Sequence, residues 1–294
     1  MKWEVESKSM IKKVLIYPNE KRDVGYVYSR RVTEYFAARG IRVYATEETA
    51  QKLQDLPVQV IQKTEKSEMD IAIILGGDGS MIQGAHFLLG TTVPILGINL
   101  GTLGYLPEVE PQNLEVSLKQ VLKGDFQVEH RLMMEAEVQI AGQKGSQIFY
   151  AVNDFVLHRN LLDGLLTVKT YVNGSYLADF RADGVITATP CGSTAYNFSA
   201  GGPILNPVAD NIILTPLCSH SMLDRSIILM GQDRLSFQVG PSGKGQEAMF
   251  SADGVDYVPL AEGSWVHVKK SEYSFPLACL LQRSFYEVLQ KKMR

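Results

Sequence analysis

Residues 76–80, Gly-Gly-Asp-Gly-Ser, combine three glycines with one carboxylate directly after an apolar run, Ile71 to Leu75. Glycines let the backbone turn sharply, and the free N–H groups at the start of a following helix attract anions. Asp78 stands within this loop, where bound phosphates would repel its charge. A carboxylate in such a place is suited to abstracting a proton or coordinating a metal ion.

The loop departs from the familiar phosphate-binding motifs. No Lys follows the glycines, so the G-x-x-x-x-G-K-[ST] pattern is absent. Ile82 stands where the G-x-G-x-x-G pattern requires its third glycine. The plain alternative is a glycine-rich turn from a strand into a helix, with a solvated Asp78.

Two further clusters occur later in the chain. Asn153 and Asp154 are adjacent within a predicted strand, so they point to opposite faces and at least one is buried or directed at a ligand. Residues 189–203, TPCGSTAYNFSAGGP, offer small residues, hydroxyls and two aromatic rings, which suit the sugars and amide of a nucleotide. The alternatives are a strand end with solvated polar residues and a long surface loop.

Composition narrows the class of protein. The 294 residues carry 29 Lys and Arg against 32 Asp and Glu, a net charge of −3, which argues against a nucleic-acid-binding or polybasic membrane surface. Cys191, Cys218 and Cys279 have no metal-binding spacing and indicate free thiols in a reducing compartment. The first ten residues lack the apolar core of a signal peptide, and no apolar run is long enough to span a bilayer. We expect a cytoplasmic protein.

The first part of the chain alternates between apolar runs and amphipathic stretches, the pattern of a parallel α/β sheet. Ligands of such sheets bind beyond the carboxyl ends of the strands. We therefore expect the glycine loops 76–79 and 101–104 to face one crevice. The predicted strands are 12–17, 41–45, 58–61, 70–75 and 94–98, and the predicted helices are 23–39, 46–56, 80–89 and 111–123.

Capping residues mark the ends of these helices. Thr46 is a suitable N-cap for the helix at 46–56, and Gly40 and Gly124 suit the C-terminal ends of two others. The helix at 23–39 is predicted to present one apolar face, formed by Val24, Val27, Tyr28, Val32, Tyr35 and Phe36.

The pattern changes near residue 128 to alternating segments typical of antiparallel strands. Asn173-Gly174 predicts a two-residue hairpin turn. The predicted strands are 135–140, 147–157, 166–172, 175–180, 226–230, 235–239, 248–251 and 264–268. A helix at 284–292, with Phe285, Val288 and Leu289 on one face, closes the chain.

These elements predict the domain organisation. An α/β N-terminal domain with a parallel sheet and the phosphate loop covers 10–128, and a β-rich, β-sandwich-like domain covers 129–272. The C-terminal segment, 273–294, is expected to return its helix to the first domain.

Taken in order, GGDGS at 76–80, Asn153-Asp154 and TPCGSTAYNFSAGGP at 189–203 resemble the NAD kinase family. The third motif is the most specific, because diacylglycerol and sphingoid-base kinases share GGDG. The resemblance implies transfer of the γ-phosphoryl group of ATP to the 2′-hydroxyl of the adenosine ribose of NAD, which gives NADP. It also implies a divalent metal cation, Mg²⁺, and a homo-oligomer, dimer or tetramer, that completes the NAD site across subunits.

The resemblance assigns roles to individual residues. Asp78 would be the general base, and Gly76, Gly77 and Gly79 would hold the phosphates of ATP. Asn153 and Asp154 would bind the ribose hydroxyls of NAD. The other implied pocket residues are Tyr105 against the adenine, Asp183 and Arg181 at the nicotinamide portion, Thr194, Ala195, Tyr196, Asn197, Phe198 and Ser199, and, as weaker matches, Cys218 and Asp253.

Three positions depart from the commonest family pattern: Ser80 stands for Thr, Asp154 for Glu, and Cys191 for Thr or Ser. Two alternatives stay open, a lipid kinase that shares GGDG and a dinucleotide sensor without turnover. The sequence also leaves open ATP against polyphosphate as donor, NAD against NADH as acceptor, dimer against tetramer, feedback regulation, and the role of Cys191.

Overall fold

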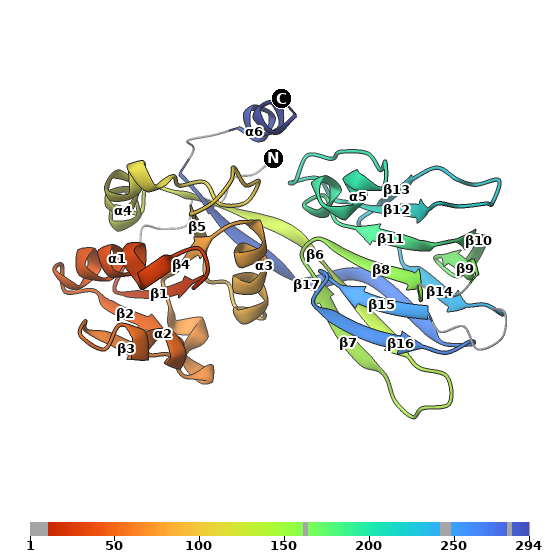
Figure 1. Ribbon diagram of the computed structural model, residues 1–294, viewed down its shortest axis with the longest axis horizontal. Coiled ribbons are helices and arrows are strands. Elements are labelled where there is room, and N and C mark those ends of the chain that lie inside the picture. The colour runs from red at the N-terminus through yellow and green to blue at the C-terminus, as the bar shows by residue number, and fades with distance from the viewer. Residues whose placement is uncertain (1–10, 161–163, 242–247, 281–283, 294) are drawn as a thin grey trace. The chain divides into compact units, whose positions relative to one another are not determined.

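A computed structural model describes residues 11–160, 164–241, 248–280 and 284–293. The chain forms two compact units, Met1–His130 with Phe275–Arg294, and Arg131–Ser274 (Figure 1). The predicted domain ends at 128 and 272 fall inside two long strands, β6 (Gln127–Gln139) and β17 (Trp265–Cys279), each of which contributes residues to both units. The first ten residues, which are predicted to lack the apolar core of a signal peptide, lie outside the described residues.

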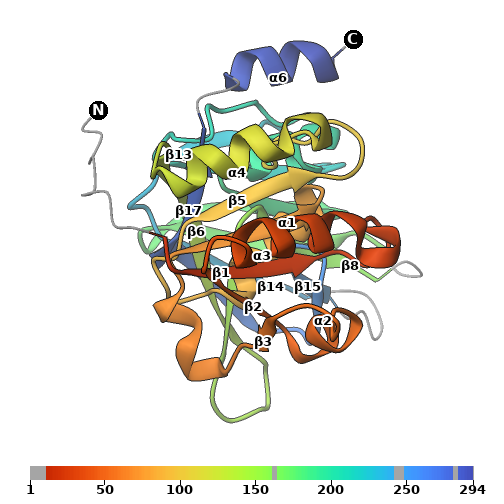
Figure 2. The same ribbon diagram turned by 90° about the vertical axis from the view of Figure 1, so that its left-hand side faces the viewer.

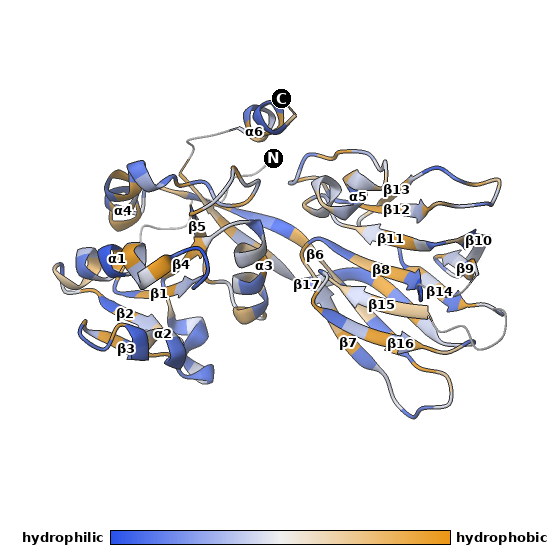
Figure 3. Ribbon diagram, in the orientation of Figure 1, coloured by the Kyte–Doolittle hydropathy of each residue, from blue (hydrophilic) through white to orange (hydrophobic). Residues whose placement is uncertain are grey.

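A parallel sheet forms the centre of the first unit, as predicted. Its order is β3-β2-β1-β4-β5-β17, with β17 joining through Leu277 beside Ile95. The strands are β1 (Lys13–Pro18), β2 (Arg42–Ala45), β3 (Val58–Val60), β4 (Ile71–Gly76) and β5 (Ile95–Asn99). Every residue of β4 is buried, and Figure 3 shows the apolar character of this strand. The loop that follows β4 therefore starts from a fully enclosed strand.

Helices cover both faces of this sheet. Ile71, Ile73 and Leu75 of β4 belong to the core that includes α1 and α4, whereas Ile74 on the opposite face meets Gly84 of α3. Figure 2 shows α1 and α4 lying across the strands. The helices are α1 (Val27–Ala37), α2 (Glu47–Lys52), α3 (Asp78–Phe87) and α4 (Leu114–Leu122), with 3-10 turns η1 (Val24–Tyr26), η2 (Lys63–Glu68) and η3 (Pro111–Asn113).

The prediction for residues 23–39 is wrong in its first turn and in part of its buried face. Gly25 and Tyr26 adopt left-handed backbone, φ +70° and +57°, so regular helix begins only at Val27. Val24 and Val27, predicted to be buried, are 76% and 53% exposed. The physical reason is Asp23, whose buried carboxylate accepts the N–H groups that open the helix and so fixes its direction.

Two further helix ends differ from the prediction. Thr46 does cap α2, but the helix ends at Lys52 and not at 56. Pro57 disfavours helical backbone before it, and the chain already turns at the buried Leu53. Helix α3 begins two residues earlier than predicted, at Asp78, because Gly77 in extended backbone serves as its N-cap.

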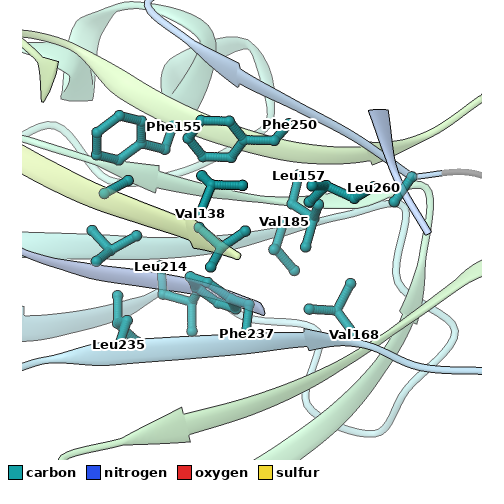
Figure 4. Close-up of a cluster of buried hydrophobic side chains, with 14 of the residues drawn as sticks. Val138, Phe155, Leu157, Val168, Val185, Leu214, Leu235, Phe237, Phe250 and Leu260 are labelled. Atoms are coloured by element: carbon teal, nitrogen blue, oxygen red, sulfur yellow. The ribbon is translucent and has the colours of Figure 1, made fainter. Parts of the chain in front are cut away.

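Two sheets form the second unit, a β-sandwich as predicted. One has the order β10-β9-β14-β17-β6-β7 and the other β13-β12-β11-β8-β15-β16. Side chains from both fill the space between them, such as Val168 and Phe237 from the first and Leu157 and Phe250 from the second (Figure 4). The new strands are β7 (Gln147–Ala151), β8 (Asp154–Arg159), β9 (Leu166–Val172), β10 (Ser175–Ala182), β11 (Gly184–Ala188), β12 (Asn211–Leu217), β13 (Ile227–Met230), β14 (Leu235–Val239), β15 (Ala248–Ala252) and β16 (Asp256–Leu260).

The strand predicted at 147–157 is two strands in different sheets. β7 pairs with β6, whereas β8 pairs with β11 and β15. Between them, the N–H groups of Val152 and Asn153 donate to the carboxylate of Asp253, so they are not available to a strand ladder. Strands β11, β12 and β16 were not predicted, and the strand predicted at 264–268 continues to Cys279. The hairpin at Asn173-Gly174 is confirmed, with φ of +50° and +78°.

The C-terminal helix α6 (Phe285–Lys292) belongs to the first unit, as predicted. Ser284 caps it by accepting the N–H of Glu287. The ring of Phe285 lies 6.3 Å from that of Tyr105, and Val288 is buried.

Candidate functional site

The turn from β4 into α3 depends on the missing side chain of Gly76. A Cβ at Gly76 would lie 2.2 Å from Ser80 Oγ, so the position admits only glycine. Asn19, which follows β1, donates its side-chain N–H to that same Oγ at 3.0 Å. The hydroxyl of Ser80 is therefore part of the packing that holds the loop on the sheet.

Asp78 lies at the first position of α3, and its two oxygens have different surroundings. Oδ1 accepts the backbone N–H groups of Tyr105 and Leu106 at 2.8 and 2.9 Å. Gly104 allows this approach, because a Cβ there would lie 2.7 Å from Oδ1. Oδ2 lies 3.4 Å from the ammonium of Lys292. The two glycine loops therefore do meet, and they hold the carboxylate through Oδ1, with Oδ2 beside Lys292.

Space is open beside the other two glycines. An added Cβ at Gly77 or Gly79 would meet nothing within 4 Å. Backbone N–H groups of the first turn of α3 have no partner inside the helix, and the helix dipole favours an anion there. The loop can thus accept phosphate oxygens by backbone contacts alone. Burial, and next the charge of Asp78, raises the pKa of the neighbouring Tyr105 hydroxyl.

The second unit contains a cavity of about 540 Å³ on the outer face of its second sheet. Alternate residues of β8, Asp154, Val156 and His158, point into it. The cavity is lined by Asn153, Asp154, Val156, His158, Arg159, Asp183, Ala195, Tyr196, Leu217, Cys218, Ser251, Asp253, Gly254 and Tyr257. Seven of these, Asn153, Asp154, Asp183, Ala195, Tyr196, Cys218 and Asp253, were singled out from the sequence.

Asp253 organises the turn that carries Asn153. Its carboxylate accepts three consecutive backbone N–H groups, those of Val152, Asn153 and Asp154, at 2.8, 2.8 and 3.0 Å. Its own N–H donates to the carbonyl of Asp154 at 2.9 Å. Asp253 adopts left-handed backbone, φ +47°, which Asp tolerates better than most residues. The hairpin between β15 and β16 thereby fixes the position where β8 begins.

Asp154 is a buried carboxyl group within the cavity, 6% exposed. Burial disfavours its charged form, and the carboxylate of Asp253 repels a second negative charge. Together these raise the pKa of Asp154 to about 7. Asp154 can therefore be either protonated or ionised near neutral pH, and a ligand that donates a hydrogen bond to it favours the ionised form.

An ion pair lies at the wall of the cavity. Arg159 Nε donates to Asp183 Oδ1 at 2.6 Å, and both side chains are partly exposed, by 30% and 38%. Sequence reasoning identified Asp183 and missed Arg159. The alternation of side chains along β8 does not indicate Arg159, because Arg159 follows His158, the last position whose side chain is expected to face the cavity. His158, Val156 and Ser251 were also missed, although each lies at even spacing from Asp154 or Asp253.

The motif 189–203 forms a 3-10 turn, η4 (Gly192–Thr194), and a short helix, α5 (Tyr196–Ser199). Gly192 packs directly on the Asn153 turn, because a Cβ there would lie 2.1 Å from the Asn153 carbonyl oxygen. Ala200 and Leu205 cover the outer apolar face of the sheet at Ile186 and Ile213. This packing brings Ala195 and Tyr196 to the cavity.

Other predicted residues lie outside the cavity lining. Asn197 is buried and donates to the carbonyls of Ser193 and Pro203, so it stabilises the 189–203 segment. Thr194 donates its hydroxyl to the Cys191 carbonyl at 3.3 Å. Residues on the exposed side are Arg181, Phe198 and Ser199. Tyr105 and the glycines 76, 77 and 79 belong to the first unit.

The described residues contain no group of three or more His, Cys, Asp or Glu side chains placed to hold a metal ion. Phosphoryl-transfer enzymes commonly bind Mg²⁺ through one or two carboxylates together with substrate phosphates. Asp78 is a carboxylate beside the phosphate loop, so the residues present fit a metal that arrives with a nucleotide. In the part of the chain that the structure describes, no helix has the length and apolarity to cross a membrane.

Comparisons with known proteins identify the family of this chain. A family model for the ATP-NAD kinase N-terminal domain matches residues 14–126, and one for the ATP-NAD kinase C-terminal domain matches 152–280. The NAD kinase of Lachnoclostridium phytofermentans is 37% identical over 285 residues, which cover 96% of this chain and 99% of that protein. The NAD kinase of Carboxydothermus hydrogenoformans is 37% identical over 236 residues, 80% of this chain and 82% of that protein.

Two solved structures share the fold. A yeast NADH kinase complexed with NADH has a TM-score of 0.89 at 23% identity, over 97% of this chain and 88% of that one. An NAD kinase from Archaeoglobus fulgidus in complex with ATP has a TM-score of 0.73 at 23% identity, over 97% and 99%. With both family models matched over most of its length and relatives at this identity, the chain belongs to the NAD kinase family, a family of phosphotransferases.

Proposed function

We propose that this protein transfers the γ-phosphoryl group of ATP to the 2′-hydroxyl of the adenosine ribose of NAD, with Asp78 as general base. The observation that carries the residue assignment is the orientation of Asp78. Two backbone N–H groups hold Oδ1, whereas the partner of Oδ2 is the ammonium of Lys292 at 3.4 Å. A carboxylate that is held by one oxygen, and whose other oxygen has only an exchangeable side-chain partner, is suited to accept a proton from a hydroxyl.

One base is sufficient for this reaction. Asp78 Oδ2 accepts the proton of the 2′-hydroxyl as the oxygen forms a bond to the γ-phosphorus. The bond from that phosphorus to the β,γ-bridging oxygen breaks, and its electrons leave with ADP. NADP and a protonated Asp78 remain, and solvent takes the proton. Alignment and charge neutralisation account for most of the catalysis in such transfers.

The phosphates of ATP would be held by the backbone of Gly76, Gly77 and Gly79 and by the start of α3. The open space beside Gly77 and Gly79 supports this role. A divalent cation, Mg²⁺, would be held by the phosphates of ATP and would neutralise part of their negative charge.

The cavity of the second unit is our candidate for the NAD site. Asn153 and Asp154 would bind ribose hydroxyls, because both line the cavity and Asp154 is a buried acceptor. Asp183 would bind the nicotinamide portion. The other proposed residues of this cavity are Ala195, Tyr196, Cys218 and Asp253. The family resemblance also implies binding roles for Tyr105, Arg181, Thr194, Asn197, Phe198 and Ser199, which lie outside the lining of this cavity. We place the protein in the cytoplasm as a homo-oligomer, with neither nucleic acid nor membrane as a partner.

The test incubates purified protein with ATP, Mg²⁺ and NAD and measures NADP with an NADP-specific dehydrogenase. Asp78→Asn retains an oxygen that can accept the Tyr105 and Leu106 N–H groups but removes the base. We expect it to bind NAD normally and to lose about 10²- to 10⁴-fold in turnover. The exposed Asp125→Asn in the same unit is the matched control and keeps wild-type turnover.

Four other outcomes would contradict parts of the proposed reaction. Turnover of Asp78→Asn within a few-fold of wild type would remove Asp78 as the base. NADP formed from polyphosphate alone, and not from ATP, would contradict the donor. Phosphorylation of a diacylglycerol or sphingoid base without any of NAD would establish a lipid kinase. Tight NAD binding without turnover under several metals would establish a sensor.

A further inference from the structure

The C-terminal helix α6 brings a cation to the phosphate loop. Lys292 Nζ lies 3.4 Å from Asp78 Oδ2 and 4.0 Å from the centroid of the Tyr105 ring. The Lys292 side chain is only 26% exposed. An ammonium group thus lies between an aromatic face and the oxygen that we propose as the proton acceptor.

The placement of this ammonium follows from how α6 is anchored. Ser284 and Glu287 form a capping box at its start, and Val288 is buried. Phe285, whose ring contacts Tyr105, lies seven residues before Lys292, so the two share one face of the helix. Both ends of this face therefore contact the segment that follows the second glycine loop.

The loops themselves supply no positive charge. Residues 76–80 and 99–106 contain no Lys, Arg or His, and Asp78 adds a negative charge. A triphosphate bound there would face this carboxylate at close range. Lysine acts as a point charge toward phosphate, and its flexible stem lets the ammonium change partners.

We propose, building on the proposed function, that Lys292 is a phosphate ligand for the ATP donor. Without ATP its ammonium pairs with Asp78 Oδ2. When ATP binds, the ammonium moves to the triphosphate, and Oδ2 becomes free to accept the ribose hydroxyl. Breaking this pair costs little, because its two side chains are 26% and 34% exposed and water screens partly exposed ion pairs.

The experiment compares steady-state kinetics of wild type, Lys292→Met, Lys292→Arg and Lys291→Met. Methionine removes the charge and keeps an unbranched stem against Tyr105. We expect Lys292→Met to raise KM for ATP about tenfold to a hundredfold, with KM for NAD within about twofold, since charged hydrogen bonds have roughly this effect. Lys292→Arg restores KM for ATP to within a few-fold of wild type. Lys291→Met, an exposed neighbour on the same helix, behaves as wild type.

Thermal melting of each variant shows whether it is folded, and Lys292→Gln is a second neutral variant if methionine destabilises the helix. Unchanged KM for ATP in folded Lys292→Met or Lys292→Gln, with active wild type, overturns the inference. An equal rise in both KM values without rescue by arginine also overturns it, since this indicates a merely structural role. Failure of the proposed function is distinct, because wild type itself would then form no NADP.

Discussion

At the scale of single residues, the second unit places two carboxyl groups close together in unlike roles. The carboxylate of Asp253 accepts three backbone N–H groups and organises a turn. Asp154 is buried beside it, and no side-chain hydrogen bond to its oxygens is found among the described residues. Burial, and next the repulsion from Asp253, raise the pKa of Asp154 to about 7.

The raised pKa of Asp154 predicts that the free energy of unfolding depends on pH. The pKa of Asp154 is about 7 in the folded protein and 3.8 in its reference state. The carboxyl group binds its proton more tightly in the folded protein than in the unfolded chain. It therefore stabilises the fold fully below the unfolded-state pKa of 3.8, and this stabilisation is lost as the pH rises to the folded-state pKa of about 7. Between pH 5 and pH 8, the free energy of unfolding of wild type should fall by about 2 to 3 kcal/mol relative to Asp154→Asn. Urea unfolding of both proteins at the two pH values measures it.

The control for this prediction is Asp256→Asn, which changes an exposed carboxylate on the neighbouring hairpin. Its difference from wild type should be the same at both pH values. If Asp154→Asn also shows a constant difference from wild type, Asp154 is ionised in the folded protein throughout this range.

At the scale of elements, the turn between β7 and β8 shows how one loop organises another. The chain leaves one sheet at Ala151 and enters the other at Asp154, and Asp253 takes the N–H groups that neither sheet uses. Thr189 N donates to the Asn153 carbonyl at 2.8 Å, and Gly192 lies against the same carbonyl. Three chain segments thus determine where the Asn153 side chain is presented.

Removing the Asp253 carboxylate should loosen this turn. We expect Asp253→Ala to lower the free energy of unfolding by about 2 to 4 kcal/mol, because partly buried N–H groups lose their acceptor. KM for NAD should rise more than KM for ATP, because the turn carries Asn153. Chemical denaturation and steady-state kinetics measure the two effects. Asp256→Ala, on the same hairpin, should change stability by less than about 0.5 kcal/mol, and equal effects of the two variants would contradict the assignment.

At the scale of the whole molecule, each unit carries one part of the proposed chemistry. The first holds the phosphate loop with Asp78, and the second holds the cavity with Asn153 and Asp154. Several apolar side chains of the second unit are exposed, among them Phe198 at 42% and Met230 at 62%. Single exposed apolar side chains are common on protein surfaces, so the expectation of an oligomer rests on the family resemblance.

We therefore predict a dimer or tetramer in solution. Light scattering at assay concentrations should give at least twice the mass of one chain, 32.6 kDa. Turnover per subunit should fall when dilution dissociates the oligomer, because the family resemblance implies an NAD site shared between subunits. A fully active monomer would contradict both the oligomer and the shared site.

The sequence by itself determined the class of fold and several of its turns. Short apolar runs followed by glycines predicted a parallel sheet with a phosphate loop at Asp78, since a buried strand needs apolar residues on both faces. Asn173-Gly174 predicted its hairpin because both positions require left-handed backbone, which Asn and Gly adopt most readily. These features depend on local backbone preferences, which neighbouring residues encode.

Tertiary structure alone decided features that depend on residues far apart in the chain. Asp253 lies about a hundred residues from Asn153, and no local pattern shows that its carboxylate splits the strand predicted at 147–157. Arg159 pairs with Asp183 across two strands, and Lys292 reaches Asp78 from the opposite end of the first unit's sequence. Such contacts result from sheet register and helix packing, so they can be known only once the chain is folded.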